Sequence, residues 1–169
     1  MKVLVTAATR HGSTAEIGAA ILRVLHLRGI DADHVAPSDL EDISGYDAVV
    51  LGSAIYAGRW LAPATSLVTR FAPRLAEIPV WLFSSGPVGE PRRPEEPAGL
   101  ATISAQTGAL EHRLFAGKLD KSELGLLERA MVRAVHASDG DYRSWGDISR
   151  WASEIADTLT LNAPGPARR

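Results

Sequence analysis

The sequence opens with MKVLV (residues 1–5) followed by TAATRHGSTAEIG (residues 6–18), and the second stretch indicates both the fold and a candidate site. It passes from an apolar, β-branched run into a turn of small and hydroxyl-bearing residues, and then into a helical pattern. The first N–H groups of a helix lack partners within the helix, and the helix dipole places partial positive charge there. With the hydroxyls of Thr9, Ser13 and Thr14 and the conformational freedom of Gly12, this turn has the parts of a phosphate cradle.

The same turn has a second interpretation, an ordinary helix N-cap formed by Ser13 or Thr14. It does not carry the GxxxxGK[ST] pattern of a Walker A loop, and with one glycine it does not carry GxGxxG either. Taken alone, the stretch leaves an N-cap and an anion site equally open.

Composition narrows the class of protein. The chain has 169 residues, of which 46% are hydrophobic and 22% charged, so we expect one domain over residues 1–161 and a disordered tail over residues 162–169. The net charge of −2 provides no basic field for nucleic acid. The absence of cysteine excludes disulfides, thiolate metal sites and a cysteine nucleophile, and the five histidines show no metal-ligand spacing, so no metal site is expected.

The apolar runs also bear on the membrane. The N-terminal run is too short for the core of a signal peptide. No apolar run approaches the roughly 18 residues needed to span a bilayer. We therefore expect a cytoplasmic protein without integral membrane segments.

Strand and helix patterns alternate along the chain. Short apolar runs of the kind found in buried strands occupy residues 2–7, 33–36, 46–52, 78–83 and 112–116. Apolar side chains at helical spacing predict helices over residues 14–28, 63–75, 98–110 and 121–137, and from residue 144 onward, with Pro73 expected to kink or end the second of these. This alternation predicts an α/β fold in which helices cover both faces of a parallel sheet.

Parallel sheets of this type bind ligands beyond the carboxyl ends of their strands. The loop after the third strand, GSAIYAGRW (residues 52–60), has small residues that admit a flat ligand, and Tyr56 and Trp60 offer aromatic faces. For Trp60 the alternative is core packing at the start of the next helix. The loop after the fourth strand, SSGPVG (residues 84–89), could equally be a plain surface turn. Together with the phosphate cradle, the two loops suggest a mononucleotide.

Four segments carry a family resemblance: ATRHGSTAEIG, YDAVVLGSAIYAG, the loop of residues 84–89, and SDGDYRSWGDISRWASEIA. In this order and spacing they resemble the flavodoxin-like superfamily, and within it the branch of the menaquinone-dependent protoporphyrinogen IX dehydrogenases. The resemblance covers nearly the whole chain. It implies a three-layer sandwich whose five-stranded parallel sheet has the order 2-1-3-4-5.

The resemblance also implies an FMN cofactor. Its phosphate would be bound by Thr9, Arg10, His11, Gly12, Ser13 and Thr14. The flavin ring would be lined on one side by Ser53, Ala54, Ile55, Tyr56, Ala57, Gly58 and Trp60, and on the other by Ser84, Ser85, Gly86, Pro87, Val88 and Gly89. The peptide in the Tyr56-Ala57-Gly58 turn would reorient to accept a hydrogen bond from N5–H of the reduced flavin, a change that Gly58 tolerates.

The function implied is electron transfer through the flavin, with a redox partner protein or a small-molecule donor or acceptor. The enzymatic alternative is a quinone-linked protoporphyrinogen IX dehydrogenase of heme biosynthesis. Two features depart from the family: residues 84–89 have no aromatic residue to cover the outer flavin face, and residues 118–143 are shorter and more acidic than the basic, membrane-facing insert of those dehydrogenases. The mixed charge of that segment argues against peripheral membrane contact.

Two other classes use the same scaffold. A signalling receiver needs a phosphoacceptor aspartate at the end of the third strand and an acidic pair after the first, where this chain has Gly52-Ser53 and Ala8-Thr9. A module that has lost its cofactor and serves only in protein interaction is the other class, and the intact first loop argues against it.

Overall fold

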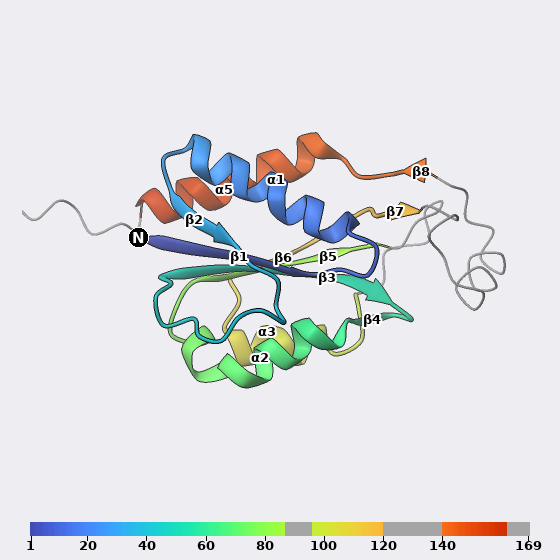
Figure 1. Ribbon diagram of the computed structural model, residues 1–169, viewed down its shortest axis with the longest axis horizontal. Helices are drawn as coiled ribbons and strands as arrows, with labels where there is room; N and C mark the ends of the chain where they lie inside the picture. The colour runs from blue at the N-terminus through green and yellow to red at the C-terminus, as the bar shows by residue number, and fades with distance from the viewer. Residues whose placement is uncertain (87–95, 120–139, 162–169) are drawn as a thin grey trace, which may run out of the picture.

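The computed structural model describes residues 1–86, 96–119 and 140–161, and these form a three-layer sandwich (Figure 1). A central sheet separates two helical layers. The helices α1 (Ser13–Leu27) and α5 (Trp145–Leu161) lie on one face of the sheet, and α2 (Ala62–Leu75) and α3 (Leu100–Thr107) lie on the other. The α/β class predicted from the alternating patterns is confirmed.

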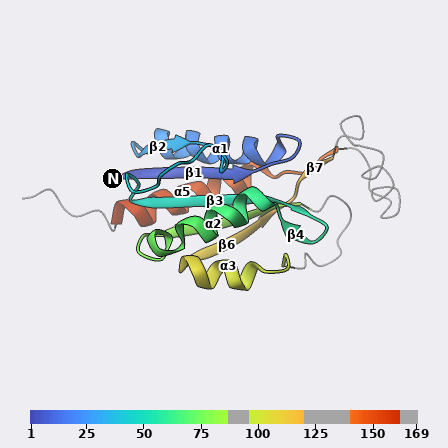
Figure 2. The same ribbon diagram turned by 60° about the horizontal axis from the view of Figure 1, so that its bottom comes forward.

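The central strands run parallel in the order β2-β1-β3-β5-β6. Because β4 is a short hairpin partner of β3, this is the order 2-1-3-4-5 of the five strands predicted from sequence. The bounds are Lys2–Ala8 for β1, Asp31–His34 for β2, Ala48–Tyr56 for β3, Arg59–Trp60 for β4, Val80–Ser85 for β5 and Glu111–Phe115 for β6. The turned view shows the strands side by side between the helices (Figure 2).

Two strand boundaries differ from the predictions. The second strand begins two residues early, at Asp31, because Gly29 (φ 74) ends α1 and the chain enters its pairing with Lys2 at once. The third strand does not stop at Gly52 but continues to Tyr56, where it turns into β4. Most of the second predicted loop is therefore an extension of the sheet.

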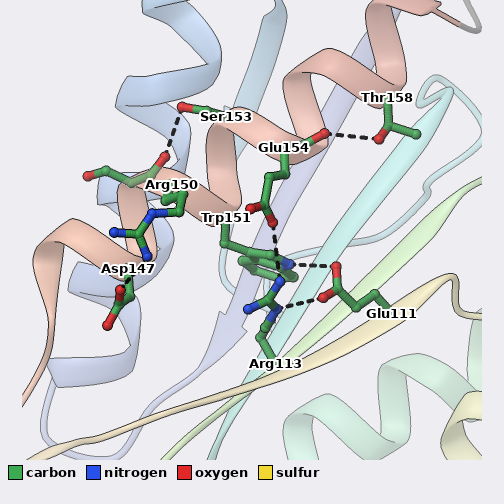
Figure 3. A network of polar contacts seen from close by, with 9 residues as sticks. Glu111, Arg113, Asp147, Arg150, Trp151, Ser153, Glu154 and Thr158 are labelled. Carbon is green, nitrogen blue, oxygen red and sulfur yellow. Dashed lines mark hydrogen bonds and ion pairs between the residues drawn. The ribbon is translucent and has the colours of Figure 1, made fainter.

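The core on the α1 and α5 side is built around three aromatic rings. The Trp151 ring centroid lies 5.6 Å from that of Phe115 and 6.1 Å from that of Phe83, both in edge-to-face geometry. The Nε1–H of Trp151 donates to Glu111 Oε2 at 2.9 Å, and Arg113 bridges Glu111 to Glu154 (Figure 3). These contacts attach α5 to the edge strand β6.

The core on the α2 and α3 side follows the predicted helical stripe, with Ala64, Leu67, Val68 and Leu75 buried. Pro73 lies inside α2, which ends two residues later. The predicted end of the helix near this proline is thus observed at Leu75.

Beyond β6, the strands β7 (Lys118–Leu119) and β8 (Gly140–Asp141) pair as a short antiparallel ribbon. The helix predicted over residues 121–137, the tail predicted at 162–169, and Pro87, Val88 and Gly89 lie outside the described residues. Within the described ranges, no helix is both long and apolar enough to cross a membrane.

Candidate functional site

The carboxyl ends of the central strands meet at one edge of the sheet. Ala8 pairs with Ser53 and Ser53 pairs with Ser84, so the three loops predicted to form a site leave the sheet side by side. Their first residues are small, which keeps the backbone at this edge accessible to a flat ligand.

The first loop enters α1 through Gly12, which adopts a left-handed conformation with φ 81 and ψ −23. A Cβ built on Gly12 would meet no atom of the described chain within 4 Å, so the site is open there. Gly12 is the N-cap residue, and no side chain of the described residues forms a capping hydrogen bond. The alternative in which Ser13 or Thr14 caps the helix is therefore wrong.

Two threonine hydroxyls of this loop are buried and have no hydrogen-bond partner in the described part of the chain. The Oγ1 atoms of Thr9 and Thr14 have no hydrogen-bond partner among the described residues, and Thr14 is fully buried. A buried hydroxyl without a partner costs about 1–3 kcal/mol. Because both hydroxyls flank the N-terminus of α1, where N–H groups and the helix dipole favour an anion, their chemistry fits a bound phosphate.

A third unsatisfied hydroxyl, that of Thr6, lies elsewhere. Side chains alternate along β1, and the neighbouring even-numbered residues Leu4 and Ala8 belong to the core on the α2 and α3 side. Thr6 therefore faces away from α1 and is no part of the first loop.

The second loop is a tight hairpin turn. Ile55 pairs with Trp60 and Tyr56 with Arg59, which leaves Ala57 (φ 48) and Gly58 (φ 72) as the two turn residues. Positive φ at both positions is the requirement of a type I′ turn. The Gly58 carbonyl accepts a hydrogen bond from the N–H of Ala98 at 2.8 Å.

An arginine connects the first two loops. The guanidinium carbon of Arg10 lies 4.4 Å from the centroid of the Tyr56 ring, a cation–π contact. Arg10 and His11 are both exposed. The positively charged side chain of Arg10 therefore lies between the first loop and Tyr56 of the second loop.

Besides Thr14, four predicted site residues are buried: Trp60, Ser53, Ser84 and Ser85. Trp60 is 6% exposed and packs among residues of the α2 and α3 side, as the alternative interpretation expected. Its Nε1–H donates to Ser84 Oγ at 2.7 Å, and Ser84 Oγ lies 2.8 Å from His112 Nε2. The Ser53 hydroxyl accepts from the N–H of Leu61 and donates to the Ala54 carbonyl. The prediction that the Trp60 ring lines the flavin is corrected, because the ring is buried in the core. The hydroxyls of Ser53 and Ser84 are engaged by groups of the chain itself.

The third loop is described as far as Gly86. Its N–H donates to the Phe115 carbonyl at 3.0 Å, and its φ of 107 is a conformation that favours glycine. A Cβ on Gly86 would come within 3.9 Å of the Ile55 carbonyl, so the second and third loops are close neighbours.

One residue beside the first loop was not predicted. Arg143, which follows β8, donates to the Ser13 carbonyl at 2.9 Å and to Glu16 Oε2 at 2.8 Å. Arg143 lies in a segment that carries the family resemblance, but its contact with Ser13 spans 130 residues and leaves no local pattern in the sequence.

Comparison with known proteins agrees with this geometry. A family model described as "Flavodoxin domain" matches residues 4–144. The chain belongs to the flavodoxin domain family. Membership supports FMN as the cofactor and electron transfer through it as the role of the chain.

Individual relatives are distant. Protoporphyrinogen IX dehydrogenase [quinone] of Escherichia coli strain K12 is 26% identical over 92% of this chain and 95% of its own length. Among solved structures, a flavodoxin from the domain Archaea superposes with a TM-score of 0.66 at 16% identity, covering 95% of this chain and 99% of its own. Oxidised flavodoxin 1 of Bacillus cereus gives 0.64 at 14% identity, covering 94% and 99%. These superpositions support the fold.

Proposed function

We propose that the three loops bind FMN, with its phosphate in residues 9–14 and its ring between residues 53–58 and the loop that begins at Ser84, and that the chain transfers electrons through this flavin. The observation that carries the proposal is the pair of buried Thr9 and Thr14 hydroxyls beside the left-handed Gly12, which have no hydrogen-bond partner among residues 1–86, 96–119 and 140–161. Bound FMN supplies one- and two-electron chemistry, while the chain binds and orients it.

Each part of the first loop has a separate role in this proposal. The N–H groups at the start of α1 and the two threonine hydroxyls donate to phosphate oxygens. Arg10 adds positive charge from its place over Tyr56, and Ser13 and His11 complete the polar lining. The ring would rest on the backbone of Ser53 to Gly58, where Ala54 and the turn leave room for a flat surface.

The first test is uptake of FMN. Purified protein should be yellow or should quench the fluorescence of added FMN, and denaturation should release the cofactor. Protein that stays colourless and takes up no FMN would contradict the proposal and favour a cofactor-free interaction module.

A matched pair of variants tests whether the Thr14 hydroxyl donates to the phosphate of FMN. Thr14→Val removes a hydroxyl proposed to donate to phosphate, so it should weaken FMN binding about 10- to 100-fold, the effect of losing a hydrogen bond to a charged group. Thr6→Val removes an equally buried hydroxyl on the opposite face of the sheet, also without a partner in the described ranges, so it should leave FMN affinity unchanged. Equal FMN affinity in both variants would contradict a phosphate role for Thr14.

A second candidate is suggested by the Escherichia coli relative, which is a protoporphyrinogen IX dehydrogenase [quinone]. In that case the protein would oxidise protoporphyrinogen IX and pass the electrons to a quinone. Anaerobic incubation of the FMN-loaded protein with protoporphyrinogen IX, with and without a quinone, separates this enzyme from an electron carrier that needs a redox partner protein. We place either activity in the cytoplasm, as the sequence predicts.

A further inference from the structure

Arg143 is a buried cation fixed by three acceptors. Its side chain is 3% exposed. Nε and Nη2 donate to the two carboxylate oxygens of Asp141 at 2.8 and 2.7 Å, and Nη1 donates to the Ser13 carbonyl and to Glu16 Oε2. The Trp145 ring covers the guanidinium, with its centroid 4.5 Å from Cζ. This arrangement sets a planar, five-donor group in one orientation.

Two of these acceptors belong to the first turn of α1. Ser13 is the first residue of the helix, and the Glu16 N–H makes its first backbone hydrogen bond, to the Gly12 carbonyl at 3.0 Å. Arg143 therefore connects the segment after β8 directly to the loop proposed to bind phosphate.

The charges explain why this connection matters for an anion. A carboxylate in the first turn of a helix competes for the same positive end of the dipole that a phosphate would use. Glu16 is such a carboxylate, and its side chain is 57% exposed. Arg143 shares its single charge between Asp141 and Glu16, so it offsets the Glu16 charge in part. The ion pair also fixes the position of Glu16, and both effects reduce the repulsion of a phosphate bound at Gly12 to Thr14.

We propose that Arg143 is a positioning residue for the phosphate of FMN: it offsets part of the charge of Glu16 and secures the first turn of α1, and so sets the affinity for the phosphate group rather than for the flavin ring. The inference rests on the proposed function. It predicts a phosphate-specific effect, whereas a merely structural brace would weaken binding of any flavin.

The experiment compares FMN with riboflavin, which has the same ring and no phosphate. For each variant, fluorescence quenching gives both dissociation constants. The dissociation constant of riboflavin divided by that of FMN measures how strongly the protein prefers the ligand with the phosphate. Arg143→Gln should lower this ratio by about tenfold or more, since it leaves the Glu16 charge uncompensated. In the double variant Glu16→Gln/Arg143→Gln, the ratio should return most of the way to the wild-type value.

Arg150→Gln is the control for loss of an arginine from the same region, because Arg150 is 69% exposed and pairs only with Asp147 among the contacts described for it. It should leave the ratio unchanged. If Arg143→Gln does not fold, Arg143→Met replaces it, since methionine also removes the charge and the donors to Ser13 and Glu16 while it fills the space beside Trp145.

An unchanged ratio in Arg143→Gln, or in Arg143→Met where that variant stands in, would overturn the inference, as would equal losses of FMN and riboflavin affinity. Failure of the wild-type protein to bind FMN at all would instead contradict the proposed function. The two failures are therefore distinguishable.

Discussion

The indole nitrogen of Trp60 donates a hydrogen bond to the hydroxyl oxygen of Ser84 at 2.7 Å, inside the core. This bond joins β4 to β5 beneath the second and third loops. Trp60 therefore has a structural role although it lies at the edge of the site, and the Ser84 hydroxyl accepts its hydrogen bond from within the core.

Replacement of Trp60 should therefore affect stability and not cofactor binding. Trp60→Phe keeps an aromatic ring but removes the donor to Ser84, so the free energy of unfolding should fall by about 1 kcal/mol, the net value of one hydrogen bond. Urea unfolding measures this change, and an FMN titration serves as the control. A large loss of FMN affinity at unchanged stability would show that the ring contacts the flavin after all.

The same hydrogen-bonded chain predicts a dependence of stability on pH. Burial lowers the pKa of His112, while Glu96 and Glu111 oppose this shift. The unfolded chain therefore takes up a proton near the ordinary pKa of about 6.5, at which the folded protein still resists protonation. Stability should be complete above that pH and should decrease as the pH falls toward the lower pKa of the folded state.

Urea unfolding at pH values between about 7 and 5 tests this dependence. His112→Gln should reduce the slope of stability against pH, and His34→Gln should reduce it separately, because burial also lowers the pKa of His34. A slope that is unchanged in both variants would show that these histidines do not cause the acid sensitivity.

Much of the fold was predictable because it depends on local periodicity. The apolar stripe of α1 and the buried runs of β1, β3 and β5 are visible in the sequence, and their alternation with helices predicts a parallel sheet. The order of the strands was implied by the family resemblance. The contiguous hydroxyls, glycine and helix start marked the first loop as a candidate anion site, and the structure excludes the N-cap alternative because Gly12 occupies the cap position without a side-chain hydrogen bond. Phosphate binding there stays a prediction. Whether an individual side chain of the site faces the core was not predictable: Ser53 and Ser84 needed the strand register, and Arg143 needed a contact to Ser13.

Gly52 provides a test of packing within the sheet. A Cβ built on Gly52 would lie 2.1 Å from Cζ of Phe83, a fully buried ring. Gly52→Ala should therefore destabilise the protein by about 1–3 kcal/mol, the usual cost of overpacking. Gly146→Ala is the matched control, because a Cβ there meets nothing within 4 Å and alanine favours the helix α5.

The clash can also be relieved by a smaller side chain at position 83. With Phe83→Leu, the double variant should lose less stability than the sum of the two single variants, since the smaller side chain gives room for the new methyl group. Strict additivity would mean that the alanine is accommodated by movement of the backbone instead.

The Ala57-Gly58 turn predicts a redox effect. Because the Gly58 carbonyl is held by the N–H of Ala98, the peptide that can reorient toward a reduced flavin is the one joining Ala57 to Gly58. Gly58→Val restricts this turn, since φ is 72 and a β-branched residue rarely adopts that conformation, whereas Ala57→Gly widens the range of conformations open to it. The two substitutions should shift the midpoint potentials of bound FMN in opposite directions. Potentiometric titration of both variants against wild-type protein measures the shifts, and potentials that stay unchanged in both would exclude this turn from the control of the flavin.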